Sequence, residues 1–90
     1  MSMSGSTTAG KITVEVRVFA TLRQFLPELG IGEAKSLQVE PGTTLDDIRE
    51  MLGLPYEAVK VIMRNSLQAY PGDTVSNGDR IAYIPAVAGG

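Results

Sequence analysis

The last two residues of the chain, Gly89 and Gly90, form the motif with the clearest chemical potential. Glycine has no Cβ, so a Gly-Gly backbone can thread a narrow channel and bring its carboxylate close to another molecule. The 90 residues include neither cysteine nor histidine. A thiol nucleophile and the commonest general base are therefore excluded, and the terminal carboxylate is the candidate reactive group.

Taken alone, this dipeptide is a weak signal. At the average glycine content of proteins, a terminal Gly-Gly arises by chance in roughly one chain in 200. A frayed end or a cloning remnant would explain it as well. The residues that follow Pro85 are all small or aliphatic, and we expect 86–90 to form a flexible tail behind a domain formed by 11–85.

Composition excludes several classes of protein. The chain is 43% hydrophobic and 20% charged, which is typical of one soluble globular domain. Without cysteine, no disulfide or thiolate metal site is possible. The formal net charge is −2 and no basic run occurs, which argues against a nucleic-acid partner and favours basic protein partners. No apolar stretch approaches the roughly 20 residues that span a membrane.

The first ten residues, MSMSGSTTAG, lack the basic and apolar regions of a signal peptide. We therefore expect 1–10 to be a disordered leader and the protein to be cytoplasmic. The acidic residues Asp46, Asp47 and Glu50 lie at the start of a predicted helix, where they complement the helix dipole. This explanation is favoured over a metal site, so no metal is expected.

The elements that must position the tail follow from hydrophobic periodicity. Residues 11–19 alternate strictly, which predicts a strand with Ile12, Val14, Val16 and Val18 on its buried face. Residues 20–26 break that period and predict a short helix or a turn. Residues 34–40 alternate again, and we expect this strand to pair antiparallel with the first.

The main helix is predicted after Thr43 or Thr44, either of which can cap it. Its apolar face comprises Leu45, Ile48, Met51 and Leu52, and Gly53 ends it. Strands are predicted at 59–64, near 67–70 and at 80–84, and Met51 and Met63 fit core positions. One helix crossing one mixed sheet makes a two-layer α+β domain.

Several segments resemble the MoaD/ThiS family, which contains the molybdopterin synthase small subunit and its sulfur-carrier relatives. The C-terminal segment carries the resemblance: an Asn77-Gly78-Asp79 turn, the apolar strand Ile81-Ala82-Tyr83-Ile84, then Pro85 and a small-residue run to Gly89-Gly90. Residues 16–23, Thr44-Leu45 and Asn65 are also similar to the family. Ala86 departs from it, because a second proline is usual there, and Ala88 stands where serine is frequent.

The resemblance implies a ubiquitin-like β-grasp fold, with a mixed sheet packed against one main helix, and a carrier that is not an enzyme on its own. A ubiquitin-activating-type adenylating enzyme (MoeB/ThiF-like) would use ATP to adenylate the Gly90 carboxylate, and no cofactor would be bound by the chain. A sulfurtransferase would then supply the sulfur of a thiocarboxylate. In molybdopterin synthase, a large catalytic subunit (MoaE-like) accepts this tail to build the molybdenum cofactor.

A docking surface for these partners is expected on the outer face of the sheet, because apolar surface usually requires a partner. The candidate partner-binding residues are Arg17, Phe19, Ile62, Ile84, Pro85 and Val87. The alternative is that the chain itself covers some of them, for example with the short helix near Leu22.

Four functions therefore stay open. The molybdopterin synthase small subunit is favoured by the proline before the tail. A sulfur carrier for thiamin, tRNA thiolation or cysteine synthesis is the alternative within the same chemistry. A protein modifier would join Gly90 to target lysines, and a plain interaction domain would have an inert tail.

Overall fold

A computed structural model describes residues 10–30 and 33–86. Its elements follow in the order β1 (Ile12–Val18), the 3₁₀ helix η1 (Ala20–Phe25), β2 (Lys35–Val39), α2 (Leu45–Met51), the 3₁₀ helix η2 (Tyr56–Ala58), β3 (Val59–Arg64), β4 (Leu67–Ala69) and β5 (Arg80–Pro85). The expected strands and the main helix are therefore confirmed, with strand ends within one residue of the prediction, whereas the short helix η2 was not predicted.

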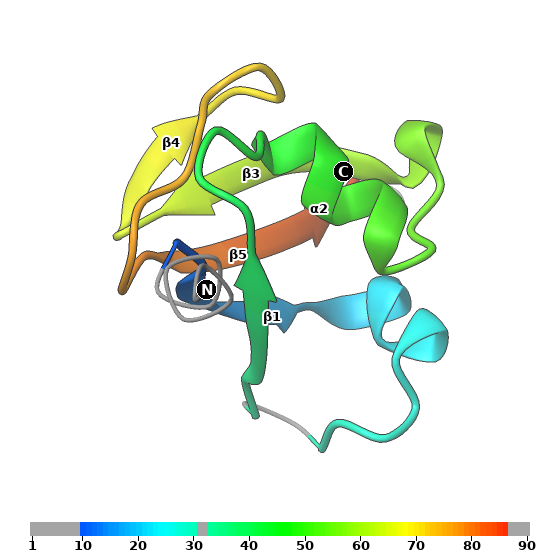
Figure 1. Ribbon diagram of the computed structural model, residues 1–90. Coiled ribbons are helices and arrows are strands. Elements are labelled where there is room, and N and C mark those ends of the chain that lie inside the picture. Colours follow the sequence, from blue (N-terminus) through cyan, green and yellow to red (C-terminus); the bar gives the residue numbers. More distant parts are fainter. Residues whose placement is uncertain (1–9, 31–32, 87–90) are drawn as a thin grey trace.

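The strands form one mixed sheet in the order β2-β1-β5-β3-β4, and α2 lies across one of its faces (Figure 1). The strands β1 and β5 are parallel, whereas the other neighbouring pairs are antiparallel. This two-layer arrangement is the predicted α+β β-grasp fold. It places β5, the strand that leads to the tail, in the middle of the sheet.

The core lies between the sheet and α2. Val14, Val16 and Val18 of β1 are buried there, as the period of two predicted, and Ile81 and Tyr83 of β5 are buried beside them. From the helix, Leu45, Ile48 and Leu52 complete the layer. The short helix η1 adds Leu22 and Leu26.

The start of α2 is fixed by a capping box. The Thr44 hydroxyl accepts a hydrogen bond from the Asp47 amide at 3.1 Å, and the Asp47 carboxylate accepts one from the Thr44 amide at 3.0 Å. Each side chain thus satisfies a backbone donor that the helix leaves unpaired. Thr44 is the cap, and Gly53, with φ +77°, follows the helix as predicted.

Both methionine predictions are wrong. Met51 is 57% exposed, because α2 ends there and Leu52 takes the adjoining core position. Met63 is half-buried and lies on the opposite face of the sheet, where it pairs with Ala82 of β5. The helical and strand periods were identified correctly, but they did not determine which of two apolar positions the core would use.

Candidate functional site

The strand β5 is the structural base of the predicted tail. Pro85 is buried, pairs with Val59 at the start of β3, and is followed by the exposed Ala86. On the other side, the Phe19 amide donates a hydrogen bond to the Tyr83 carbonyl at 3.2 Å. Val87, Gly89 and Gly90 lie outside the described residues. Strand β5 is thus paired on both sides, up to Tyr83 on the β1 side and up to Pro85 on the β3 side.

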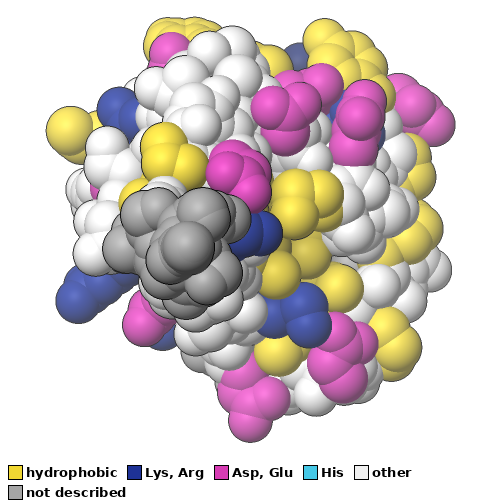
Figure 2. All heavy atoms as spheres, viewed as in Figure 1, with side chains coloured by type: hydrophobic (Ala, Val, Ile, Leu, Met, Phe, Trp, Pro, Cys, Tyr) yellow, Lys and Arg dark blue, Asp and Glu magenta, His cyan; other side chains and the backbone are white. Residues whose placement is uncertain are grey.

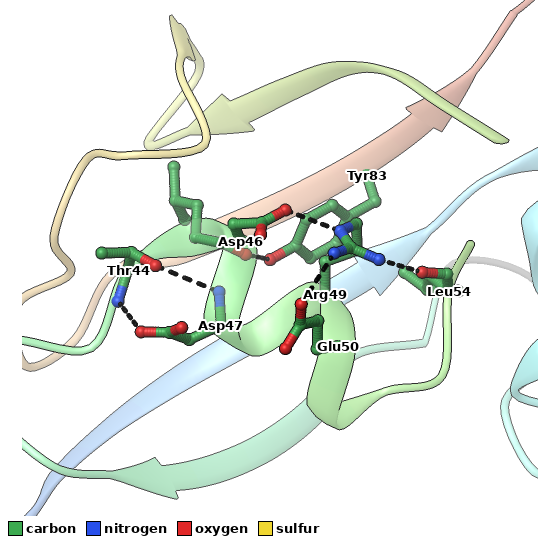
Figure 3. A network of polar contacts seen from close by, with 8 residues as sticks. Thr44, Asp46, Asp47, Arg49, Glu50, Leu54 and Tyr83 are labelled. Atoms are coloured by element: carbon green, nitrogen blue, oxygen red, sulfur yellow. Dashed lines mark hydrogen bonds and ion pairs between the residues drawn. The ribbon is translucent and has the colours of Figure 1, made fainter. Parts of the chain in front are cut away.

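Tyr83 anchors β5 to the helix through the core. Its side chain is fully buried, and its hydroxyl donates a 2.6 Å hydrogen bond to the carbonyl of Leu45 (Figure 3). Burial raises the pKa of the Tyr83 phenol well above its ordinary value, and the nearby Asp46 carboxylate adds to the rise. The phenol therefore stays protonated and keeps this donor in place at neutral pH.

A polar cluster on α2 is centred on Arg49, which is 8% exposed (Figure 3). Its guanidinium donates to the Leu54 carbonyl at 2.6 Å and to Asp46 at 2.7 Å, and it pairs with Glu50 at 3.3 Å. The hydrogen bond from Arg49 lowers the pKa of Asp46, and the same bond raises the pKa of Arg49. Within the described residues, no group of acidic side chains is arranged to hold a metal ion.

The turn that leads into β5 is fixed by asparagine side chains. The Thr13 amide donates to Oδ1 of Asn77 at 2.9 Å, and the Gly78 amide donates to the Thr13 carbonyl at 2.7 Å. Asn65, at φ 54°, uses its side chain to donate to the buried Asp79 and to accept from the Arg80 amide, both at 2.9 Å. These bonds tie the start of β5 to β1 and to the β3–β4 turn.

The face of the sheet opposite α2 carries a groove of about 390 Å³, which we call the outer groove. Strand register explains its composition, because Arg17 of β1, Ala82 of β5 and Met63 of β3 are consecutive cross-strand neighbours. The lining residues are Arg17, Phe19, Met63, Ser66, Arg80, Ile81, Ala82 and Ile84. The groove lies beside the strand that leads to the tail.

The structure brings together three of the predicted partner-binding residues and separates two others. Arg17, Phe19 and Ile84 line the outer groove, and Phe19 is 41% exposed. Ile62 is only 5% exposed and faces the helix, so its expected place on the outer surface is wrong. Pro85 is also buried, because it shares the inward side of β5 with Ile81 and Tyr83.

The error at Ile62 has a physical cause. The strand β3 carries apolar residues on both faces, and its register shifts between Val59 and Val61, so alternation alone does not show which face is buried. Sequence reasoning also missed Arg80 and Met63 as lining residues of the groove. Arg80 could have been predicted, because it lies two and four residues before Ala82 and Ile84 on β5 and therefore points to the same face of the sheet.

A second groove, of about 460 Å³, lies on the helix side of the sheet, and we call it the helix-side groove. Its lining residues are Asp46, Arg49, Tyr56, Glu57, Val59, Lys60, Val61, Ile62, Gln68, Ala69, Tyr70 and Pro71. The Arg49 guanidinium lies 5.4 Å from the centroid of the Tyr56 ring, a cation–π distance. Figure 2 shows acidic, basic and apolar side chains interspersed over the face of the molecule that carries α2.

Comparison with known families decides the classification. The profile of the Mut7-C ubiquitin family matches residues 11–89 of the chain. The chain belongs to this family. The match covers nearly all of the domain described above and agrees with the expected MoaD/ThiS-like ubiquitin fold. No curated protein matches the sequence.

Solved structures agree with this Mut7-C ubiquitin assignment at the level of the fold. The HVO 2177 protein of Haloferax volcanii superposes with a TM-score of 0.71 at 21% identity, over 90% of this chain and 89% of that one. SAMP1 of the same organism gives 0.66 at 21% identity, over 87% and 99%. Subunits 1 and 2 of the molybdopterin-converting factor of Helicobacter pylori form a complex in which the matching chain gives 0.56 at 22% identity, over 88% and 100%.

No helix among the described residues is long and apolar enough to cross a membrane.

Proposed function

We propose that this Mut7-C ubiquitin protein is a sulfur carrier whose reactive group is the Gly90 α-carboxylate. A carboxylate is a poor electrophile, so a partner enzyme first joins it to the α-phosphate of ATP, and pyrophosphate leaves. A sulfide-level sulfur atom from a donor then attacks the acyl carbon, and AMP leaves with the C–O bonding electrons. The product is a C-terminal thiocarboxylate.

The proposal is carried by the Gly89-Gly90 motif, which follows β5 after three small or aliphatic residues. This strand is anchored at both of its ends and on its buried face. A well-anchored strand that leads to two residues without side chains allows a partner to orient the reactive carbonyl in the partner's active site. The amino-acid composition also supports a carrier that depends on a partner enzyme, because the chain has no cysteine or histidine with which to catalyse the transfer itself. The protein is thus a carrier that is not an enzyme on its own.

Within this chemistry, we favour the small subunit of a molybdopterin synthase. Its partners would be a MoeB/ThiF-like adenylating enzyme, which uses ATP, a sulfurtransferase, and a MoaE-like large subunit. The likeness to a chain in the Helicobacter pylori complex supports this choice. Carriers for thiamin, tRNA thiolation or cysteine synthesis would use the same tail, and they differ in the partner that receives the sulfur.

The second candidate is a protein modifier. The likeness to SAMP1, which is a small archaeal modifier protein, favours it. In this function the adenylated Gly90 would be attacked by a lysine Nζ of a target, and an isopeptide bond would form with loss of AMP. Gly-Gly remnants on target lysines after proteolysis would distinguish it from a carrier that acts only in sulfur transfer.

The decisive experiment incubates the full chain with ATP, a sulfide source and the cognate adenylating enzyme, and follows intact mass. We expect a mass gain equal to the replacement of one oxygen atom by sulfur at Gly90. Deletion of Gly89 and Gly90 should abolish the gain. A chain that ends at Gly90 and gains no mass with an active enzyme would refute the carrier function.

A pair of glycine variants tests whether the partner's active site excludes a side chain at Gly89, as distinct from a general effect of adding a side chain to the protein. Gly89→Leu should prevent adenylation, because a side chain at this position would clash in the partner's channel. Gly72→Leu is the matched control, since the φ of Gly72 lies outside the left-handed region and a Cβ placed on it would meet no other atom within 4 Å. If Gly89→Leu is thiocarboxylated as efficiently as Gly72→Leu, a tail without a side chain at this position is not required.

A further inference from the structure

Strand β4 covers only half of its neighbour β3. The register pairs Ile62, Met63 and Arg64 of β3 with β4, and it ends where Ile62 meets Ala69. On that side, the other half of β3, residues 59–61, has no partner strand among the described residues, and Figure 1 shows β3 continuing past the end of β4. The backbone groups that point away from β5 at these residues therefore form a free edge of the sheet, which we call the β3 edge.

A turn after Ala69 keeps the β3 edge open. The Tyr70 amide donates a hydrogen bond to the Asp73 carboxylate at 3.0 Å, and the Asp73 amide donates one to the Tyr70 carbonyl at 3.0 Å. The chain then binds the start of α2, because the Pro71 carbonyl accepts a 3.0 Å hydrogen bond from the Asp46 amide. Proline has no N–H with which to continue a strand ladder. The chain is thus directed to the helix, and it does not extend β4 along β3.

The β3 edge is also irregular on the side of β5. The register shifts between Val59 and Val61, and Lys60 has no partner residue on β5. Lys60 is therefore the extra residue of a β-bulge, a feature that is common at sheet edges and beside functional sites. The Val59 amide is used by η2, because it donates to the Tyr56 carbonyl. Within 10–30 and 33–86, Lys60 thus has no strand neighbour on either side.

The β3 edge borders the helix-side groove, which has a volume of about 460 Å³ and is lined there by Val59, Lys60 and Val61. Tyr56 of η2 and Tyr70 after β4 line the same groove and are 66% and 60% exposed. Three residues of strand extend over about 10 Å, whereas specific protein dimers bury about 1,200 Å² or more. The β3 edge is therefore suited to one short extended chain that also contacts the tyrosines, rather than to a second folded copy.

Two charges of opposite sign lie beside the β3 edge without a partner in the described fold. Glu57 of η2 and Lys60 are exposed and line the helix-side groove, and within the part of the chain that the structure describes neither forms an ion pair. The other two charged lining residues, Asp46 and Arg49, pair with each other at 2.7 Å. A bound segment therefore gains from an acidic side chain beside Lys60 and a basic one beside Glu57.

We infer that the β3 edge binds an extended segment of a partner protein, which adds to the sheet as a strand antiparallel to β3 and in line with β4. The orientation follows from β4, which runs antiparallel to β3 and ends where the β3 edge begins. In this orientation the segment's acidic residue, beside Lys60, precedes its basic residue, beside Glu57. The contacts involve neither the outer groove nor the Gly89-Gly90 motif, so they do not depend on the proposed function.

The probe is the blocked peptide acetyl-Val-Glu-Val-Lys-Val-amide, which favours a strand and places its acid before its base. It is titrated into the ¹⁵N-labelled full chain up to about 10 mM, which suffices to detect a millimolar complex. We expect the largest amide shifts at Lys60 and Val61, and nuclear Overhauser contacts between the backbones of the peptide and β3. The absence of shifts, or shifts centred away from the β3 edge, would overturn the inference.

Two N-methylated forms of the probe distinguish strand addition from binding through side chains alone. One form carries N-methyl groups on its glutamate and lysine, and the other carries them on its third and fifth residues. Successive amides of a strand point to opposite sides, so only one form loses the hydrogen bonds to β3. We expect that form to bind about tenfold more weakly than the unmodified peptide and the other form to bind about equally well. Equal affinities of the two forms would overturn the inference.

An exchange of charges tests the orientation. The peptide acetyl-Val-Lys-Val-Glu-Val-amide has the composition of the probe with its charges in reverse order. We expect the natural chain to bind the probe about threefold more tightly than this peptide, and Glu57→Lys/Lys60→Glu to reverse the preference without a change in net charge. Lys11→Glu/Glu40→Lys is the matched control, because it exchanges an ion pair that does not line the helix-side groove. An unchanged preference in the first double variant would overturn the inference.

Two other occupants of the β3 edge are outcomes of the same experiment. A second copy of the chain would shift the Lys60 and Val61 amides when the protein concentration rises without peptide. The chain's own end would compete with the probe, so that deletion of Gly89 and Gly90 would tighten peptide binding. We expect neither effect, and either one would overturn the inference in favour of that occupant. Loss of thiocarboxylation together with selective peptide binding would refute the carrier function alone.

Discussion

The helix-side groove and the outer groove contain arginines in contrasting situations. In the helix-side groove, Arg49 is almost fully buried and is held by the Leu54 carbonyl, Asp46 and Glu50. In the outer groove, Arg80 is exposed, and the described lining residues include no acidic side chain. The first arginine stabilises the connection after the helix, whereas the second gives its surface a charge that a partner can recognise.

This difference shows that charge near a cavity is not in itself a sign of function. The charged groups of Arg49 and Asp46 are used within the fold, because the hydrogen bond between them reduces what either can offer to a ligand. Changes on the helix side should therefore reduce stability. Changes in the outer groove should leave stability nearly constant and alter docking.

The largest loss of stability is expected from Arg49→Ala. Removal of the guanidinium leaves the Leu54 carbonyl without its buried donor and Asp46 without its partner, which should cost about 3 kcal/mol of unfolding free energy. Glu50→Ala is the control, since its side chain is 67% exposed and its ion pair is worth less than about 1 kcal/mol. Urea denaturation measures both. Similar losses in the two variants would contradict the structural role of Arg49.

A smaller loss, of about 2 kcal/mol, is expected from Asn65→Ala. The side-chain hydrogen bonds to Asp79 and from the Arg80 amide are lost, and alanine tolerates φ 54° less well than asparagine. Asn65→Gly removes the same hydrogen bonds but fits the positive φ. Thermal unfolding should therefore rank the glycine variant between the natural chain and the alanine variant. The reverse order would show that backbone strain is not significant at this turn.

The raised pKa of the Tyr83 phenol predicts that the unfolding free energy depends on pH, an effect that the residues of the outer groove should not share. The pKa of this phenol is raised in the folded protein, so above about pH 10 the unfolded chain loses the proton while the folded chain keeps it. Stability is full below that pH and falls above it, by up to about 1.4 kcal/mol per pH unit. Tyr83→Phe cannot ionise, so its unfolding free energy should fall less steeply. Equal slopes in urea denaturation from about pH 9 to pH 11 would contradict the assignment.

The sequence predicted the layers of the fold well because its strongest signals are local. The alternation of Val14, Val16 and Val18, a threonine cap before the main helix and the stop at Gly53 each determine an element through near neighbours in the chain. The alternation and the stop are present as predicted, and of the two predicted caps, Thr43 and Thr44, the structure uses Thr44. The antiparallel pairing of β1 and β2 followed from their short separation, and the parallel pairing of β1 and β5 gives the mixed sheet that the family resemblance implied.

The candidate site was predicted only in part, because it depends on which face of each strand is covered. Alternation separates Ile62 from Met63, but both are apolar, and only the position of α2 decides that Ile62 is buried. The role of Arg49 was missed for a related reason. Its partner at Leu54 lies beyond the end of the helix, so helical spacing gave no indication of that contact.

The smallest change in stability, and the sharpest test of the comparison, is expected from Phe19→Ala. Phe19 is 41% exposed and lines the outer groove, so removal of its ring should cost only about 1 kcal/mol of unfolding free energy. Aromatic residues at interfaces often dominate binding, so the rate of ATP-dependent thiocarboxylation at limiting adenylating enzyme should still fall about tenfold. Met51→Ala is the control, because Met51 is at least as exposed but belongs to α2 on the other face.

If both variants react at the natural rate, the outer groove does not dock the activating enzyme. If Phe19→Ala unfolds the chain, the ring belongs to the core, and the contrast between the two faces fails at this residue.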